Sequence, residues 1–78
     1  MNLVDIKEFL AFTAAEFQEE KNSLLLSTRF RDLSSWSSLN ALIYISNIHD
    51  KYGVLLSSVE LSKSNDLNDI LNLIQEKV

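Results

Sequence analysis

The near absence of proline and glycine constrains this chain more than any other feature. Its 78 residues contain no proline and a single glycine, Gly53. Sheets and tight hairpins normally need more turn residues than this, so the composition favours helices. The apolar fraction is 46% and only 23% of the residues are charged, which suits a small core better than a disordered chain. The sequence therefore predicts one all-α domain over residues 1–78.

Apolar residues at helical spacing predict two long helices in the first two thirds of the chain. The first runs from about Asn2, its expected cap, to Glu19, and Leu3 belongs to its apolar face. The second runs from Ser38 to Tyr52. Gly53 follows it and can adopt the left-handed conformation that commonly ends a helix.

The last third of the chain predicts a short helix and a closing helix. Ser57 or Ser58 is expected to cap the short one, and Asn65 to cap the closing one. The closing helix carries four residues expected to face inward: Leu67, Ile70, Leu71 and Ile74.

The inward face of the helix over 38–52 is expected to begin at Leu39. This stripe comprises Leu39, Leu42, Ile43, Ile45 or Ser46, Ile48 and Tyr52. The segment from Lys21 to Ser37 has no helical period and is expected to be a long loop pinned by apolar residues. Within it, Leu24-Leu25-Leu26 fits a short strand or a helical turn, and the pattern does not decide between them.

Few side chains in the chain could support catalysis. There is no cysteine, which excludes disulfides, thiolate zinc sites and a cysteine nucleophile. The only histidine, His49, is eleven residues beyond Ser38, about 16 Å along a helix and too far to activate that serine. No cluster has metal-ligand spacing, and one glycine cannot build a phosphate-binding loop. We therefore expect no enzyme activity, no catalytic residue and no metal site.

The distribution of charged residues argues against nucleic acids and membranes as partners. The net charge is −4, and Arg29 and Arg31 form the only local basic pair, which argues against nucleic-acid binding. No apolar run approaches the roughly 20 residues that span a bilayer, and charged residues interrupt the start of the chain as no signal peptide would. A cytoplasmic monomer that does not bind membranes is expected.

Ser38 is the one serine whose position suggests chemistry. It stands at the start of a helix, where unpaired N–H groups and the positive end of the helix dipole favour an attached phosphate group. Ser37 is a good helix cap in its own right and would leave Ser38 free. Because the apolar stripe is expected to begin at Leu39, Ser38 should face outward.

Nearly the whole chain resembles an acyl or peptidyl carrier protein. The resemblance rests on Asp32-Leu33 in the long loop, on Trp36-Ser37-Ser38-Leu39 where some members have Trp-Asp-Ser-Leu, and on Tyr52-Gly53 at the end of the second helix. It implies an acyl-carrier-like bundle of three main helices plus one short helix, with a long ordered loop before the second helix. It also implies that Ser38 receives a 4′-phosphopantetheine arm from coenzyme A, on which acyl or aminoacyl groups are carried as thioesters.

The implied partners are a phosphopantetheinyl transferase and the enzymes that load, condense or transfer the acyl or aminoacyl group. The residues expected to dock them are Ser37, Leu39, Asn40, Tyr44 and Asn47. The helix over 38–52 offers only Asp50 as an acidic residue, where fatty-acid carriers typically present several. A specialised pathway of the fatty-acid or polyketide kind is therefore expected rather than the general fatty-acid synthase.

Two other interpretations remain open. The aspartate that usually precedes the attachment serine is replaced by Ser37, so the chain could be an unmodified carrier-like docking or scaffold subunit. It could also be an unrelated helical interaction module in which Leu24-Leu25-Leu26 closes over a partner.

Overall fold

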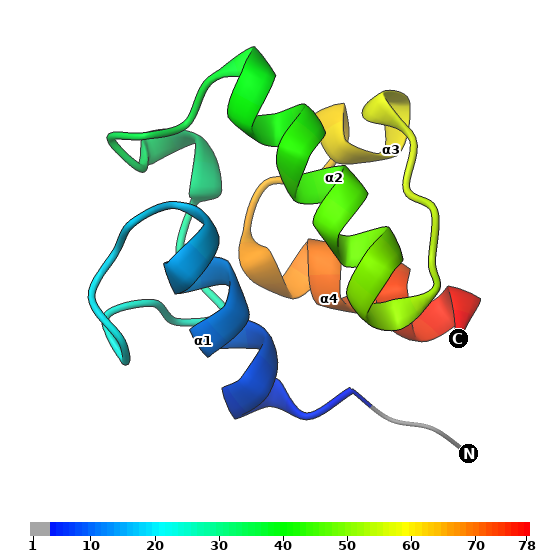
Figure 1. Cartoon of the computed structure of the whole chain (residues 1–78), viewed down its shortest axis with the longest axis horizontal. Helices are drawn as coiled ribbons and strands as arrows, with labels where there is room; N and C mark the ends of the chain where they lie inside the picture. The colour runs from blue at the N-terminus through cyan, green and yellow to red at the C-terminus, as the bar shows by residue number, and fades with distance from the viewer. Residues whose placement is uncertain (1–3) are drawn as a thin grey trace.

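Four α-helices follow one another along residues 4–78, the part of the chain that the computed structural model describes (Figure 1). They are α1 (Ile6–Glu16), α2 (Ser38–Tyr52), α3 (Ser58–Ser62) and α4 (Leu67–Lys77). A short 3-10 helix, Phe30–Asp32, interrupts the long connection between α1 and α2. The described part of the chain contains no strand, so the all-α prediction is confirmed, as are three longer helices and one short one.

The bounds of α2 agree with the sequence prediction. The Ser37 hydroxyl accepts a hydrogen bond from the Asn40 amide at 3.1 Å, which satisfies one of the unpaired donors at the helix start. At the other end Gly53 has φ of 69°, and its amide donates to the carbonyl of His49. A side chain there would be strained, so glycine is the residue that the end of α2 requires.

Helix α1 is shorter than predicted. It begins at Ile6, where Asp5 accepts a hydrogen bond from the Glu8 amide as the cap; the predicted cap Asn2 and the predicted apolar position Leu3 lie outside the described residues. It ends at Glu16 because Gln18 takes a left-handed conformation with φ of 57°. This Schellman turn lets the Glu19 amide reach the carbonyl of Ala14, but it uses a glutamine, so the sequence carried no glycine signal for it.

The caps of the two last helices are close to their predicted positions. Ser57 caps α3 and forms a capping box, since its hydroxyl accepts from the Glu60 amide while the Glu60 carboxylate accepts from the Ser57 amide. Helix α4 is capped by Asp66, one residue beyond the predicted Asn65. The Asn65 amide instead donates to the carboxylate of Asp69.

The long connection is pinned to the core as predicted. Leu24 and Phe30 are buried, and the Trp36 ring packs at a tilt against the Phe30 ring, with 4.8 Å between ring centroids. The leucine run forms neither a strand nor a helical turn: Leu24 packs inward and Leu25 is exposed, and the Leu26 carbonyl accepts a hydrogen bond from the first turn of α4.

The face of α2 that enters the core agrees with the predicted one only in part: Ile45 and Ile48 are buried as predicted. Tyr44, Ile45 and Ile48 are buried and define the inward face. The exposed fractions of Leu39, Leu42 and Ile43 are 66%, 58% and 45%, so their prediction as core residues was wrong. Seven of the fifteen residues of α2 are polar or charged, and the inward side is apolar at helical spacing. The prediction began its stripe at Leu39 instead, because large apolar residues also occur on the opposite side of the helix.

Packing against α1 selects that side. The Tyr44 ring lies edge-on to Phe17 at 4.9 Å between centroids, and its hydroxyl pairs with that of Thr13 at 2.8 Å. Both polar groups are buried and satisfy each other, which makes Tyr44 a core residue.

Among residues 4–78, no helix has the length and apolar character needed to cross a membrane.

Candidate functional site

Ser38 is the first residue of α2 and is exposed to solvent. Its neighbour Ser37 performs the capping: the Ser37 hydroxyl accepts from the Asn40 amide, and the Ser37 carbonyl accepts from the Ala41 amide at 2.8 Å. The prediction that Ser37 caps the helix and Ser38 faces outward is confirmed. The stated reason was wrong in part, because Leu39 is itself exposed.

The backbone just before Ser38 is fixed by hydrogen bonds from two sides. The Ser35 hydroxyl donates to the carbonyl of Phe17 at 2.6 Å, which ties the loop to the end of α1. The side chain of Asn40 donates to the Ser35 carbonyl at 2.6 Å, which ties the same loop to α2. Because Trp36 also packs on Phe17, at 5.3 Å between ring centroids, the hydroxyl of Ser38 is presented from a fixed turn.

A cavity of about 300 Å³ opens beside Ser38. It lies between α2 and α3, which are neighbours in Figure 1. Its wall is mainly apolar, and Arg31 and three serines add polar groups. The lining residues are Arg31, Trp36, Ser38, Ala41, Leu42, Ile45, Ser58, Leu61 and Ser62. A cavity with apolar walls and a few polar groups is the usual form of a small-molecule site.

Arg31 is the residue at this site that sequence reasoning missed. Its guanidinium donates three hydrogen bonds to backbone carbonyls at the end of α3: to Ser64 at 2.6 Å, to Ser62 at 2.8 Å and to Leu61 at 3.1 Å. The sequence showed only a basic pair at positions 29 and 31. No local pattern indicates which carbonyls a distant arginine will reach.

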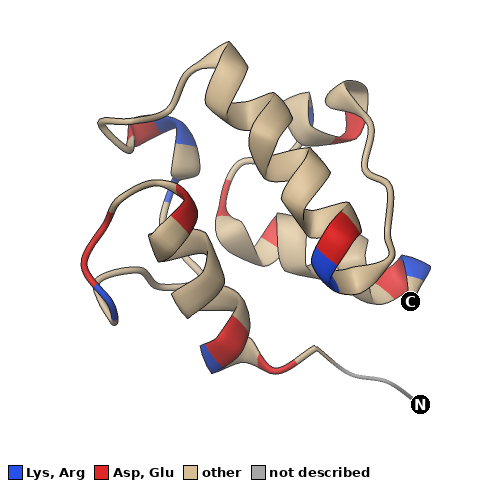
Figure 2. Ribbon diagram, in the orientation of Figure 1, with Lys and Arg blue, Asp and Glu red and all other residues tan. Residues whose placement is uncertain are grey.

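The solvent side of α2 carries an apolar strip next to Ser38. Leu39, Leu42 and Ile43 are three and four residues apart along one side of the helix, and we call them the outer stripe. Figure 2 shows α2 without charged residues except near its end. In the sequence these charged residues are Asp50 and Lys51. Adjacent exposed apolar side chains are typical of surfaces that bind partners.

The predicted docking residues have different surroundings. Ser37 and Leu39 are exposed next to Ser38. Asn40 and Asn47 are half-buried: Asn40 binds the loop, and Asn47 donates to the carboxylate of Glu16 on α1 at 2.6 Å. The expectation that Tyr44 is exposed for docking was wrong, because its side chain is fully buried between α1 and α2.

The shifted pKa values lie away from Ser38. Burial raises the pKa of Tyr44 well above its usual range and raises the pKa of Tyr52 to about 12. Hydrogen bonding from the Ser57 amide, with help from Lys77, lowers the pKa of Glu60. His49 is exposed, and within residues 4–78 no three histidine, aspartate or glutamate side chains are grouped as a metal site would require. The site at Ser38 thus offers a hydroxyl and a cavity rather than an acid–base pair.

The chain matches no protein-family model, and no curated protein matches it in sequence. Any function for this chain is therefore inferred from its own residues, in particular those around Ser38.

Proposed function

We propose that this chain is a discrete acyl or aminoacyl carrier protein that holds its cargo as a thioester on a 4′-phosphopantetheine arm attached to Ser38. The chain itself catalyses no reaction in this proposal. The order of its helices, the long connection before α2 and the Trp36-Ser37-Ser38-Leu39 run support an acyl-carrier-like bundle. A specialised biosynthetic pathway is proposed as its setting.

The observation that carries the proposal is that Ser37 caps α2 and Ser38 does not. A serine at a helix start usually caps the helix, and its hydroxyl is then occupied by backbone amides. Here Ser37 makes that hydrogen bond, and Ser38 is exposed one residue further on. The Ser38 hydroxyl can therefore be esterified without loss of the cap.

The surroundings of Ser38 fit a phosphodiester and a flexible arm. The first turn of α2 contains no acidic residue that would repel a phosphate, and its backbone dipole favours a negative charge. In the attachment step that the resemblance implies, the Ser38 oxygen attacks the pyrophosphate of coenzyme A on the transferase. A phosphodiester forms, and the adenosine bisphosphate leaves. The cavity beside Ser38 has the apolar walls that an acyl chain would contact.

The outer stripe supplies a contact surface for the transferase and for the loading, condensing and transferring enzymes. Its three side chains lie on the same helix as Ser38, and the neighbouring part of α2 carries no charge. Recognition would depend on apolar contact and shape, with little electrostatic steering. This is consistent with partners other than those of strongly acidic carriers.

Coexpression with a broad-specificity phosphopantetheinyl transferase, followed by intact-mass measurement, tests the proposal. Wild type should gain the mass of one arm and Ser38→Ala should gain none, while keeping the melting temperature of wild type. Ser34→Ala removes an exposed loop serine and should load like wild type. No mass gain in wild type, or an equal gain in Ser38→Ala, would contradict the proposal.

The alternative is an unmodified docking or scaffold subunit, favoured by Ser37 in place of aspartate and by the outer stripe. Under this alternative, wild type stays unloaded and Ser37→Asp, which also caps helices well, switches loading on. Complete loading of the native sequence would exclude it.

The third interpretation, an unrelated interaction module that closes Leu24-Leu25-Leu26 over a partner, has little support. Leu24 and Leu26 pack on the core of the chain itself, and only Leu25 is exposed to contact a partner.

A further inference from the structure

Arg31 fastens the end of α3 to the long connection that leads to Ser38. The three carbonyls that it binds belong to Leu61, Ser62 and Ser64, at the end of α3 where helical hydrogen bonding stops. Its guanidinium carbon also lies 4.8 Å from the centroid of the Phe30 ring, and Phe30 is fully buried. The side chain therefore joins a core-anchored segment to α3.

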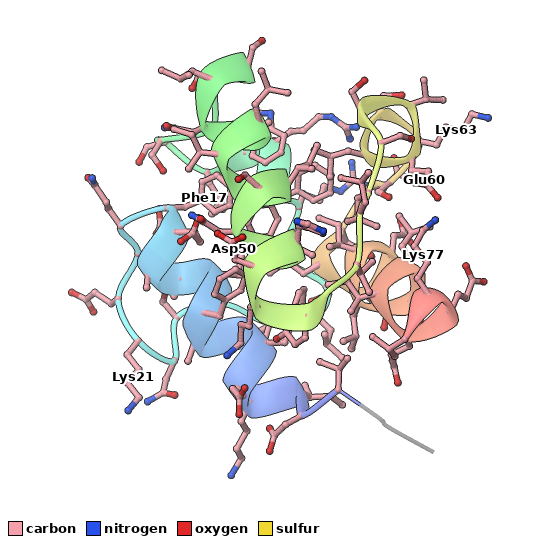
Figure 3. The ribbon with its side chains drawn as sticks, turned by 45° about the vertical axis from the view of Figure 1, so that its right-hand side comes forward. Phe17, Lys21, Asp50, Glu60, Lys63 and Lys77 are labelled. Carbon is pink, nitrogen blue, oxygen red and sulfur yellow. The ribbon has the colours of Figure 1, made fainter. Side chains whose placement is uncertain are left out.

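Helix α3 needs contacts of this kind to keep its position. It has five residues, too few for a helix that is stable by itself in water. From the α4 side, Lys77 forms an ion pair with Glu60 at 3.1 Å, and Figure 3 shows both side chains on that side of α3. Arg31 holds α3 on the side of the cavity, and Leu61 anchors it in the core.

The residues that Arg31 positions form one wall of the cavity beside Ser38. Leu61 and Ser62 line it from α3, and Leu42 and Ile45 line it from α2. The volume of about 300 Å³ is at the lower end of the roughly 300–1,000 Å³ range of ligand sites. It equals about ten water volumes of roughly 30 Å³ each. Because a methylene fills about the same volume as a water molecule, a straight chain of at most about ten carbons fills the cavity.

We propose that Arg31 is a positioning residue that limits the cavity beside Ser38 to straight aliphatic acyl chains of at most about ten carbons; this inference rests on the proposed carrier function. Arg31 keeps the α3 wall close to α2, so that a longer chain cannot be fully enclosed. Its planar guanidinium reaches three carbonyls at once, whereas a lysine ammonium is a single point of contact. Loss of the three bonds lets α3 move away and enlarges the cavity.

A chemical test needs no transferase, so its result does not depend on whether Ser38 is modified in cells. The chain has no cysteine, and Ser38→Cys therefore supplies a single thiol at the mouth of the cavity. Alkyl methanethiosulfonates of increasing chain length attach straight chains to it as mixed disulfides. Trp36, the only tryptophan, lines the cavity and reports entry of the chain by its fluorescence.

In the Ser38→Cys background, each enclosed methylene should raise the melting temperature by up to roughly 3–6 °C, until the cavity is full. We expect the melting temperature and the Trp36 fluorescence to reach a plateau at a chain length of at most about ten carbons. Adding Arg31→Met should move the plateau to longer chains. Arg31→Lys should move it in the same direction and serves as the second variant if Arg31→Met does not fold.

Two matched controls separate positioning from charge and from general stability. Lys63→Met removes an exposed positive charge at the end of α3 without removing a cavity residue, and its plateau should equal that of the parent. Lys77→Met breaks the ion pair on the far side of α3 and should lower the melting temperature without lengthening the preferred chain. An unchanged plateau in both Arg31 variants, or no plateau in the parent, would overturn the inference.

Discussion

The inward face of α2 is at most 9% exposed, whereas the outer stripe on the same helix is 45–66% exposed. Both are built from large apolar side chains. The inward face meets the aromatic rings of Phe12 and Phe17 and belongs to the same core cluster as the buried residues of α4. Its single hydroxyl has a buried hydrogen-bond partner. The outer stripe meets solvent next to Ser38, and one of its members forms part of the cavity rim.

This contrast shows that one helix can serve the core and a binding surface with the same chemistry. Burial makes the inward face a source of stability, because each apolar group there is removed from water. The outer stripe gains little of that stabilisation in the isolated chain. Its apolar area remains exposed, as the proposed carrier function requires of the helix that begins at Ser38.

The largest expected effect is on the inward face. Ile48→Ala removes a fully buried side chain and leaves a cavity beneath α2. The free energy of unfolding should fall by about 2–5 kcal/mol, a large part of the total for so small a domain. Urea unfolding followed by circular dichroism measures it. A loss below about 1 kcal/mol would show that Ile48 is not in the core.

Tyr44→Phe tests the buried hydroxyl pair on the same face. The ring is retained, but the Thr13 hydroxyl, which is also buried, loses its partner. The free energy of unfolding should fall by about 1–3 kcal/mol, the usual cost of a buried polar group left without a hydrogen bond. Thr13→Val in the Tyr44→Phe background removes the orphaned hydroxyl and should restore part of the loss.

Tyr44→Phe should also change how steeply the free energy of unfolding declines with pH in alkaline solution. Burial raises the pKa of Tyr44 in the folded state above its ordinary value of 10.0. The stability linked to this group is complete below pH 10 and declines above it, because the unfolded chain then loses a proton that the folded chain keeps. The decline should be shallower in Tyr44→Phe; Tyr52, with its pKa of about 12, maintains a residual slope. Equal slopes would contradict the burial of an un-ionised Tyr44.

The smallest expected effect is on the outer stripe, and it gives the matched comparison. Ile43→Ala makes the same chemical change as Ile48→Ala on the exposed side of the helix. It should alter the free energy of unfolding by less than about 1 kcal/mol, since little area leaves water there and alanine favours helices. A loss as large as that of Ile48→Ala would remove the distinction between the two faces.

The sequence predicted the parts of the fold that depend on neighbouring residues. Ser37 and Gly53 mark the ends of α2 because a cap hydroxyl and a left-handed glycine act within a few residues. The inward face of α4 was also predicted, since polar residues leave that helix a single apolar side. The end of α1 was missed because the left-handed position is taken by a glutamine and not by the glycine that usually marks a helix end.

By itself, the sequence determined the helical class, the ends of α2 and the candidate serine, because each follows from local backbone chemistry. The tertiary structure decided which side of α2 is buried, since large apolar residues occur on both sides of that helix and the predicted stripe began at Leu39 on the exposed one. The tertiary structure also forms the cavity and gives Arg31 its hydrogen-bond partners. Both require segments about thirty residues apart in the chain to meet in space. Packing and long-range hydrogen bonds, rather than pattern, place that cavity next to Ser38.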